Sequence, residues 1–256
     1  MFFSSFFYFE LFFVRLIAVL VNQVSAIFTQ NYCQIFPLGD NALTVEFGNE
    51  ISPELNDKAV NLSQYFEENR FAGLIETVPA YCSVSLFYDV FAVRKKFPEF
   101  PTAFHAVKNL AENALQNLAQ AKTKAPRLIE IPVNFDDKFA LDLEFIASHN
   151  HLTKQKVVKI FTAKIYRVFM LGFLPAFAYM GEVDETIAAP RRQSPRLIVP
   201  KGSVGIAGKQ TGIYPFDSPG GWQIIGKTDF ELFTPNAENP CALQAGDLIQ
   251  FYASNK

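Results

Sequence analysis

The segment from Ala189 to Thr228 constrains the fold of this chain more than any other stretch. It holds five of the 15 prolines and seven of the 13 glycines, placed between short runs rich in β-branched residues. Each proline fixes a backbone angle and removes an amide donor, while each glycine permits geometries that other residues tolerate poorly. Short strands interrupted this often are typical of a small β-barrel whose loops hold a site.

The first half of the chain has a different pattern, in which strands and amphipathic helices alternate. Leu43, Val45 and Phe47 alternate with polar residues, as they do in a half-buried strand. Ser52 followed by Pro53 fits the first turn of a helix, because serine caps the free amides and proline needs no partner there. Further strands over residues 73–79 and 81–89 and a helix after Pro101 complete an α+β pattern.

A polar segment, residues 119–126, separates the two patterns. It lacks large apolar residues and ends in Pro126, which is typical of a linker between domains. Beyond it we expect a strand, two short helices and then the barrel strands. The sequence therefore predicts an N-terminal α+β domain over residues 31–122 and a β-barrel domain over residues 127–256.

Residues 1–30 form an apolar extension with eight phenylalanines and only two charged residues, Glu10 and Arg15. The apolar run 16–21 and the small residues Ser25 and Ala26 resemble a secretion signal or membrane anchor. No positively charged region precedes the run, and it is shorter than the roughly 20 residues that span a bilayer. An upstream-start artefact or disordered extension is favoured over a targeting segment, and we expect a cytoplasmic protein.

The charge balance and the metal-ligating residues exclude several classes of function. The chain carries 23 basic and 25 acidic residues, and its only basic run is residues 94–96, so a nucleic-acid surface is not expected. Three cysteines without a CxxC pair argue against a disulfide framework or zinc ribbon and fit a reducing compartment. His149 and His151 lack a third ligand nearby, so we expect no metal site.

Residues 221–228 match the phosphate-loop pattern GxxxxGK[ST]. A phosphate loop follows a buried strand and opens a helix, so that its amides surround the phosphates. Here the turn residues 216–220 precede the motif, and residues 229–235 contain two Phe and a Pro, which favour no helix. Because residues 223–225 favour a strand, we interpret the match as coincidental.

A second glycine-rich stretch, residues 202–209, has two interpretations. Its glycines can permit the close approach of neighbouring strands in a barrel. Alternatively, its backbone amides can face an anionic ligand. Neither interpretation excludes the other.

The candidate site residues lie between Arg191 and Trp222. Arg191, Arg192 and Arg196 lie in a segment bounded by prolines. Arginine binds carboxylate or phosphate through paired hydrogen bonds and stays charged, which suits an acid substrate or an acyl phosphate, whereas a surface ion pair is the commoner role of any single arginine. Uncharged polar groups would recognise an amide or lactam, with turn formation, barrel closure and core packing as the alternatives. These polar candidates are Ser203, Gln210, Thr211 and Tyr214. The only tryptophan, Trp222, would be a lid or a stacking wall for the substrate, with a core aromatic as the equal alternative.

Several motifs occur in an order that resembles one family. They are PLGDNALTVEF (37–47), IETVP (75–79), IEIPV (129–133), LGFLPAFAYMG (171–181), the 189–228 segment and AGDLIQF (245–251). Together they resemble the B subunit of the bacterial ATP-dependent 5-oxoprolinase. The same family includes the kinase inhibitor Kip and the first subunit of allophanate hydrolase, and it is related to the carboxyltransferase part of urea carboxylase.

The resemblance implies a fold and a function. The fold is a small N-terminal α/β sandwich followed by a cyclophilin-like β-barrel. The implied function is that of a hydrolase component that opens the lactam of 5-oxoproline to glutamate, with ATP as the cofactor, bound by this chain or elsewhere in the complex. The implied partners are a cyclophilin-fold chain like the C subunit of that enzyme, near which the site would lie, and a chain like its A subunit.

The family pattern PRR…PR favours Arg191 and Arg196 as the catalytic residues that neutralise developing charge, while a surface ion pair stays the expected role of Arg192. Polar residues of the 203–214 stretch would orient the substrate. Two alternatives stay open, because one fold serves many functions. The chain would then be a non-catalytic inhibitor of a sensor histidine kinase, or a subunit for amide hydrolysis of allophanate or urea.

Three positions depart from the family pattern. Ala176 replaces the usual glycine of a P-G-F motif, and Phe161 replaces a common histidine. The glycine-rich loop that usually follows IEIPV is NFDDK here, residues 134–138. If that histidine or loop serves chemistry in the family, we expect the activity of this member to be altered.

Overall fold

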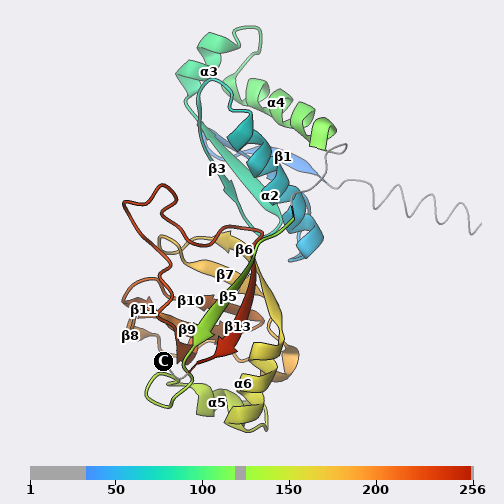
Figure 1. Ribbon diagram of the computed structural model, residues 1–256. Helices are drawn as coiled ribbons and strands as arrows, with labels where there is room; N and C mark the ends of the chain where they lie inside the picture. Colours follow the sequence, from blue (N-terminus) through green and yellow to red (C-terminus); the bar gives the residue numbers. More distant parts are fainter. Residues whose placement is uncertain (1–32, 119–124, 255–256) are drawn as a thin grey trace, which may run out of the picture.

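The computed structural model describes residues 33–118 and 125–254. The predicted extension, residues 1–30, and most of the predicted linker, residues 119–126, lie outside the described residues. The described chain forms two lobes, one drawn in blue and green and the other in light green to red (Figure 1). Each lobe has its own main sheet and its own hydrophobic core.

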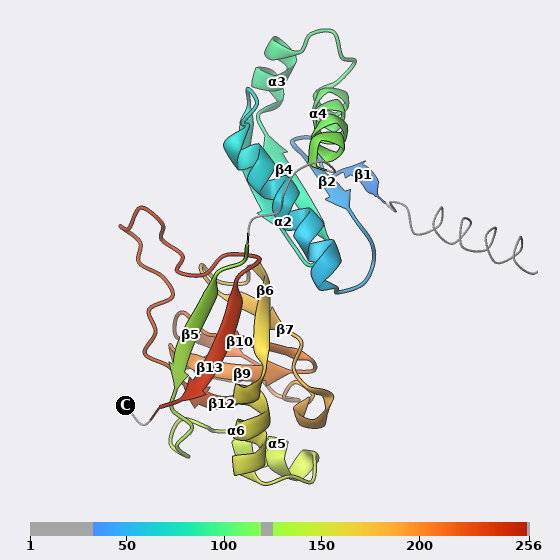
Figure 2. The ribbon, with the colours of Figure 1, turned by 45° about the vertical axis from the view of Figure 1, so that its right-hand side comes forward.

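The N-terminal lobe is a four-stranded antiparallel sheet covered by helices. The sheet has the order β1-β2-β4-β3. Its strands are β1 (Gln34–Pro37), β2 (Ala42–Glu46), β3 (Leu74–Pro79) and β4 (Ser83–Tyr88). The helices are α2 (Pro53–Glu68), α3 (Val90–Lys96) and α4 (Ala103–Leu118). Helices α2 and α4 contact each other and the sheet, so that they share one face of it (Figure 2).

Local rules explain where α2 begins and which face it buries. The Ser52 hydroxyl accepts a hydrogen bond from the Leu55 amide (3.2 Å), and Pro53 occupies the first turn, which confirms the predicted cap. Ala59, Leu62 and Phe66 follow at helical steps, and all are buried in the N-terminal core. The sequence analysis missed β1 and the short helix α3.

The C-terminal lobe is built on a curled seven-stranded sheet with the order β12-β9-β10-β7-β6-β13-β5. Only the β13–β5 pair is parallel among the pairs of this sheet that the structure describes. Its strands are β5 (Leu128–Val133), β6 (Ile165–Leu171), β7 (Ala178–Gly181), β9 (Ser203–Ala207), β10 (Gln210–Ile213), β12 (Gln223–Lys227) and β13 (Leu248–Ala253). The remaining elements are α5 (Leu143–His149), α6 (Lys154–Ala163), the turn η1 (Glu185–Ile187) and the ribbon of β8 (Arg196–Val199) and β11 (Ser218–Gly220).

One isolated bridge joins the two edges of this sheet. Asn134, directly after β5, exchanges backbone hydrogen bonds of 2.7 and 2.9 Å with Lys227 in β12. The bridge requires Gly226, because a Cβ there would lie 2.8 Å from the Asn134 carbonyl oxygen. The loop that departs from the family pattern thus begins at the residue that closes the curled sheet.

The two glycine-rich stretches are strands. Residues 203–207 and 210–213 form the paired strands β9 and β10, which confirms the strand-pair interpretation. β9 also pairs with β12 on its other side, so its backbone serves the sheet. Gly202 has φ +81°, and a Cβ there would meet the Thr228 carbonyl oxygen at 2.1 Å. Residues 223–227 are strand β12 with no helix after it, so the phosphate-loop match is coincidental, as predicted.

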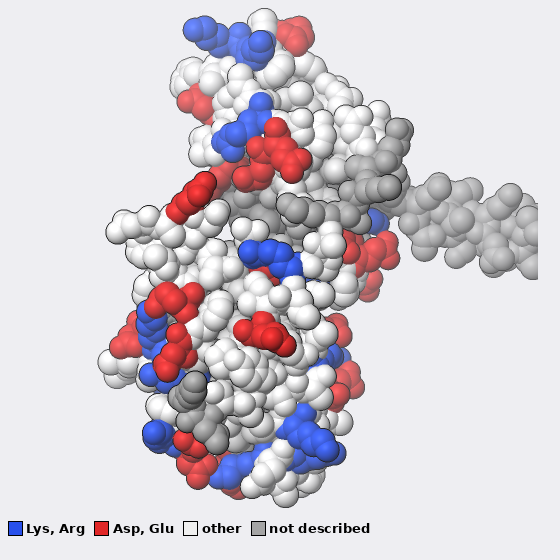
Figure 3. Space-filling view, viewed as in Figure 1, with Lys and Arg blue, Asp and Glu red and all other residues white. Residues whose placement is uncertain are grey.

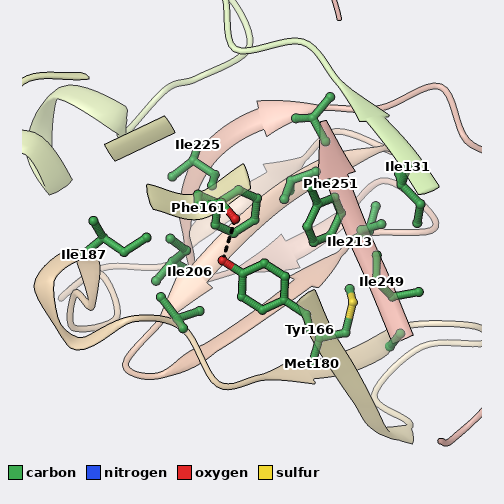
Figure 4. Packing of buried hydrophobic residues seen from close by; sticks show 14 of the residues in the cluster. Ile131, Phe161, Tyr166, Met180, Ile187, Ile206, Ile213, Ile225, Ile249 and Phe251 are labelled. Carbon is green, nitrogen blue, oxygen red and sulfur yellow. Dashed lines mark hydrogen bonds between the residues drawn. The ribbon is translucent and has the colours of Figure 1, made fainter. Parts of the chain in front are cut away.

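The core of the C-terminal lobe fills the inside of the curled sheet beneath α5 and α6 (Figure 4). Phe161 of α6 is fully buried there, and its ring stacks on Phe251 with the centroids 5.0 Å apart. The Tyr166 hydroxyl donates to the Phe161 carbonyl oxygen (2.9 Å). The position of the family histidine is therefore a packing position in this chain.

A buried asparagine joins the two lobes. Asn56 of α2 is fully buried, and its Nδ2 donates to the carbonyl oxygens of Ala80 and Phe169, each at 2.9 Å. Its Oδ1 accepts from Arg167 Nε at 2.7 Å, while the same guanidinium pairs with Asp57 at 2.6 Å. Because Phe169 and Arg167 belong to β6, the Asn56 side chain holds the N-terminal lobe against the curled seven-stranded sheet, which we call the barrel sheet.

Replacing this asparagine tests how much it stabilises the junction. We expect Asn56→Ala to lower the free energy of unfolding by about 3 kcal/mol, because Arg167 Nε and the carbonyl groups of Ala80 and Phe169 lose the partner that Asn56 supplies. Asn61→Ala, on the same helix, is the matched control and should leave stability close to wild type. Urea denaturation of the full chain measures both, and equal values for the two variants would contradict this role of Asn56.

Candidate functional site

Five aromatic side chains gather on the face of the barrel sheet that points away from the core of Figure 4. Along β7, Ala178 and Met180 enter that core, so the intervening Tyr179 points to the other face. We call these residues the aromatic cluster: Tyr81, Phe177, Tyr179, Tyr214 and Trp222. Phe177 lies at its centre, with ring centroids 4.9 Å from Tyr179, 5.3 Å from Tyr214 and 5.5 Å from Trp222.

The aromatic cluster has a buried floor and a partly exposed rim. Phe177, Tyr214 and Trp222 are 1%, 1% and 5% exposed, whereas Tyr81 and Tyr179 are only partly buried. Edge-to-face contacts of this kind stabilise the rings beyond the area that they bury. The floor is therefore a rigid apolar surface, and the rim presents two phenol groups.

Tyr81 brings the N-terminal lobe into this cluster. It lies between β3 and β4, and its ring centroid is 6.4 Å from that of Tyr179 and 5.6 Å from that of Phe169. Gln210 Nε2, from β10, donates a hydrogen bond to the Tyr81 hydroxyl. The candidate site is consequently built from both lobes.

Arg191 lies over the cluster. Its guanidinium carbon is 5.9 Å from the Trp222 ring centroid, which is within the range of a cation–π contact. The side chain belongs to an exposed residue, and in the described part of the chain it forms no salt bridge. Arg191 therefore offers a positive charge to an anionic ligand at the rim.

The other two arginines of the segment are held by a buried carboxylate. Asp142, whose side chain is 4% exposed, accepts from Arg192 Nη1 at 2.9 Å and from both Nη atoms of Arg196 at 2.8 Å. Its Oδ2 also accepts from the Ile224 amide at 2.7 Å. The ion pair predicted for Arg192 is confirmed, although its partner is buried rather than at the surface. Arg196, predicted to be catalytic, shares that partner.

Two further hydrogen bonds dock this irregular segment on the turn before β12. The Arg192 amide donates to the Gly221 carbonyl (2.8 Å), and Gln223 Nε2 donates to the Pro190 carbonyl (2.9 Å). Pro190 and Arg192 flank Arg191 on either side. The backbone that carries Arg191 is thus fixed at both neighbours, which leaves only its side chain to move.

Burial keeps the phenols of Tyr81 and Tyr214 protonated. It raises the pKa of Tyr81 to about 12, with a smaller contribution from nearby Tyr179, against the lowering effects of Gln210 and Arg191. The pKa of Tyr214 is raised for the same main reason. Both groups therefore act at neutral pH through hydrogen bonds and not as bases.

The uncharged candidates divide between the cluster and the sheet. Gln210, Tyr214 and Trp222 lie in or beside the aromatic cluster. Ser203 is buried in β9, where its carbonyl accepts from the Tyr214 amide (2.9 Å). Thr211 is fully buried, and its Oγ1 donates to the Gly205 carbonyl (2.9 Å), so its hydroxyl serves the sheet. The substrate-binding roles of all five residues stay predictions.

The sequence analysis missed Tyr81, Tyr179 and Asp142. Tyr179 stands within the motif LGFLPAFAYMG, and Tyr81 follows the motif IETVP by two residues, which was the available signal. Asp142 directly precedes α5 but makes no capping hydrogen bond there. A carboxylate at a helix start that does not cap the helix is available for another partner, here two guanidinium groups.

Clefts and surface charge give further bounds on the site. Two clefts, of about 190 and 510 Å³, lie at the lobe junction along α2, and a third of about 210 Å³ lies beside Tyr214, lined also by Lys201 and Lys227. Basic and acidic residues intermingle on the face shown in Figure 3, so that face carries no basic tract.

The described residues offer neither a metal cluster nor a membrane-spanning helix. Their His, Cys, Asp and Glu side chains form no group of three that could hold a metal ion. None of their helices combines the length and the apolar character that a membrane crossing requires.

Comparisons with known proteins agree on one family. The model of the family described as carboxyltransferase domain, subdomain C and D, matches residues 33–243. The chain is 44% identical over 219 residues to the 5-oxoprolinase B subunit of Bacillus subtilis, covering 85% of this chain and 91% of that protein. It is 43% identical over 154 residues to the 5-oxoprolinase B subunit of Haemophilus influenzae, covering 59% of this chain and 72% of that protein.

A solved structure supports the fold. The crystal structure of TTHA0988 matches with a TM-score of 0.73 and 31% identity, covering 84% of this chain. The match covers only 40% of the TTHA0988 chain, so the present chain corresponds to less than half of that protein.

The buried carboxylate can be tested directly. We expect Asp142→Asn to lower the free energy of unfolding by about 2–3 kcal/mol, because two guanidinium groups lose their counter-charge; their partial exposure reduces the cost below that of a fully buried pair. The matched control is Asp137→Asn, since Asp137 is 82% exposed and pairs with Lys154 at the surface. Urea denaturation should leave the control near wild type, and a similar result for Asp142→Asn would contradict its anchoring role.

Proposed function

The chain belongs to the carboxyltransferase domain family, subdomain C and D, and from this premise we propose that it is the B subunit of an ATP-dependent 5-oxoprolinase. In that role it would bind 5-oxoproline, whose lactam is opened to glutamate, and would act as one component of a hydrolase complex. The proposal is supported by relatives named as the B subunit of 5-oxoprolinase that are 43% and 44% identical to this chain.

The observation that carries the proposal is the position of Arg191 over Trp222, in the aromatic cluster that also contains Tyr81 and, through its hydrogen bond to Tyr81, Gln210. 5-Oxoproline is a small five-membered lactam with one carboxylate. A guanidinium binds the carboxylate, a flat aromatic wall packs on the ring, and an amide or hydroxyl pairs with the lactam group. These three kinds of group meet at the rim of the aromatic cluster.

We propose different tasks for the two arginines predicted to be catalytic, and their different partners support this division. Arg191 is available to contact the substrate. Both Nη atoms of Arg196 donate to Asp142, so in this arrangement Arg196 orders the segment. It contributes positive charge to the site without contacting the substrate. Arg191 can therefore contact the substrate without breaking an ion pair, whereas Arg196 would first have to separate from Asp142.

The phosphate-loop match provides no site for ATP. The phosphate-loop match is strand β12, its Lys227 amide pairs with Asn134, and no helix follows it. Amides that belong to a sheet ladder cannot surround a phosphate. We therefore assign ATP to another chain of the complex.

The proposal includes partners and a more detailed fold. A cyclophilin-fold chain like the C subunit and a chain like the A subunit would complete the enzyme. In this proposal the C-terminal lobe is a cyclophilin-like barrel and the N-terminal lobe an α/β sandwich; the curled sheet and the helices on one face of the four-stranded sheet support it. The cytoplasmic location, the kinase-inhibitor alternative and the allophanate or urea alternative stay predictions.

Substitution of Arg191 tests the site. In the complex of the full chain with its two partner chains, we expect Arg191→Met to lower kcat/KM for 5-oxoproline about 100-fold, because a charged hydrogen-bond partner of the carboxylate is lost. Glutamate release from 5-oxoproline and ATP measures it. Lys159→Met, which removes an exposed charge on α6, is the matched control and should change kcat/KM less than twofold.

Two outcomes would count against the proposal. Equal activity of the Arg191→Met and wild-type complexes would remove Arg191 from the site. Absence of turnover in a folded, co-purifying wild-type complex would contradict the enzyme function, and inhibition of a sensor histidine kinase would then be measured instead.

A further inference from the structure

We propose that Tyr81, from the N-terminal lobe, donates a hydrogen bond to the lactam carbonyl oxygen of the substrate, so that the site is complete only across both lobes. This inference rests on the proposed function, since it names a residue that recognises the lactam group. It concerns a residue from outside the barrel, far in sequence from the 189–228 segment.

The first step is the direction of the hydrogen bond between Gln210 and Tyr81. The amide nitrogen of Gln210 can only donate, so the Tyr81 oxygen accepts, and the phenol keeps its own proton for another acceptor. Among the residues that the structure describes, no group accepts that proton. The side chain is partly exposed at the rim, which leaves the proton accessible to a ligand.

The second step is the place of this hydroxyl among the other ligand-facing groups. The rings of Tyr81 and Tyr179 are 6.4 Å apart, and those of Tyr179 and Trp222 are 5.9 Å apart. Arg191 lies over Trp222. A continuous series of contacts therefore joins the Tyr81 phenol to the Arg191 guanidinium. The rings of Tyr179 and Trp222 lie between them and form an aromatic wall.

The chemistry of 5-oxoproline has the same order. Its carboxylate and its lactam carbonyl stand on opposite sides of one ring nitrogen, so a cation and a neutral donor separated by a flat wall match them. Because the pKa of Tyr81 is raised to about 12 by burial, the phenol remains a neutral donor throughout the physiological range. A neutral donor suits a carbonyl oxygen without attracting the carboxylate to the wrong end.

The third step is the support behind Tyr81. Asn56 donates to the carbonyl oxygen of Ala80, the residue before Tyr81, and to that of Phe169 in β6. Phe169 in turn packs against the Tyr81 ring, with the centroids 5.6 Å apart. Asn56 is thus a positioning residue, which fixes the backbone that carries Tyr81 to the sheet that carries Gln210.

The test compares two ligands that differ in the lactam group. Tyr81→Phe keeps the ring and removes only the hydroxyl. We measure the dissociation constant of the full chain for 5-oxoproline through the fluorescence of Trp222, its only tryptophan, and the KM of the assembled complex. Cyclopentanecarboxylate, which has the ring and the carboxylate but no lactam, is the second ligand. Tyr65→Phe, whose hydroxyl accepts from Asn117 within the N-terminal lobe, is the matched control.

We expect Tyr81→Phe to weaken 5-oxoproline binding about tenfold, in both the dissociation constant and KM, and to leave cyclopentanecarboxylate binding within twofold. The Tyr65→Phe control should bind both ligands as the wild type does. Loss of affinity for the lactam alone is the result that a merely structural role of Tyr81 would not produce.

The contrary outcomes are distinguishable. Equal weakening for both ligands would show that Tyr81 only shapes the site, and no weakening for either would remove it from the site; each overturns this inference while the proposed function stands. If the wild type neither binds 5-oxoproline as the full chain nor turns it over in the complex, the proposed function and this inference both fail.

Discussion

The arrangement of the candidate site depends on one buried carboxylate. Residues 190–195 have no regular structure, and Asp142 is the group that ties them to the barrel, through two guanidinium groups and the Ile224 amide. Burial of a carboxylate is costly, and loss of one partner of a buried ion pair is strongly destabilising, so the donors around Asp142 are needed together. Without this anchor, the segment would keep only the hydrogen bonds of its Pro190 and Arg192 backbone to Gln223 and Gly221, together with the cation–π contact of Arg191 with Trp222.

The anchor also explains why neighbouring arginines have different environments. Arg192 and Arg196 both pair with Asp142 and neutralise its negative charge. Arg191 forms no salt bridge within the described residues, so its positive charge stays unpaired there. A paired guanidinium serves stability, whereas an unpaired one that is ordered by its neighbours is available for a ligand. Within six residues, the segment thus contains two arginines that anchor it and one arginine whose charge is available for the proposed ligand.

The parts of this fold that follow local rules could be predicted from the sequence. The cap at Ser52 and the strand pair around Gly205 depend on neighbours close in the chain. The contacts that build the site do not: Asp142 lies 50 and 54 residues from its arginines, and Tyr81 lies 129 residues from Gln210. Spacing alone could not rank the three arginines, because their ranking depends on a carboxylate that no motif marks.

The positions that depart from the family pattern belong to the scaffold more than to the candidate site. Phe161 fills the barrel core, where a ring stacked on Phe251 gains from apolar burial that a polar imidazole would lack. Ala176 has φ +62°, where a Cβ costs about 1–2 kcal/mol relative to glycine, but its buried methyl group recovers about 0.8 kcal/mol.

The turn that contains Ala176 keeps its form in spite of that cost. The Phe177 amide donates to the Leu174 carbonyl (3.0 Å), and the Gly172 amide donates to the Phe177 carbonyl (3.1 Å). These hydrogen bonds direct the Phe177 ring into the centre of the aromatic cluster. The substitution of glycine by alanine therefore changes the strain in the turn and leaves the Phe177 ring in place at the floor of the aromatic cluster. At this position the scaffold departs from the family pattern, whereas the candidate binding surface is retained.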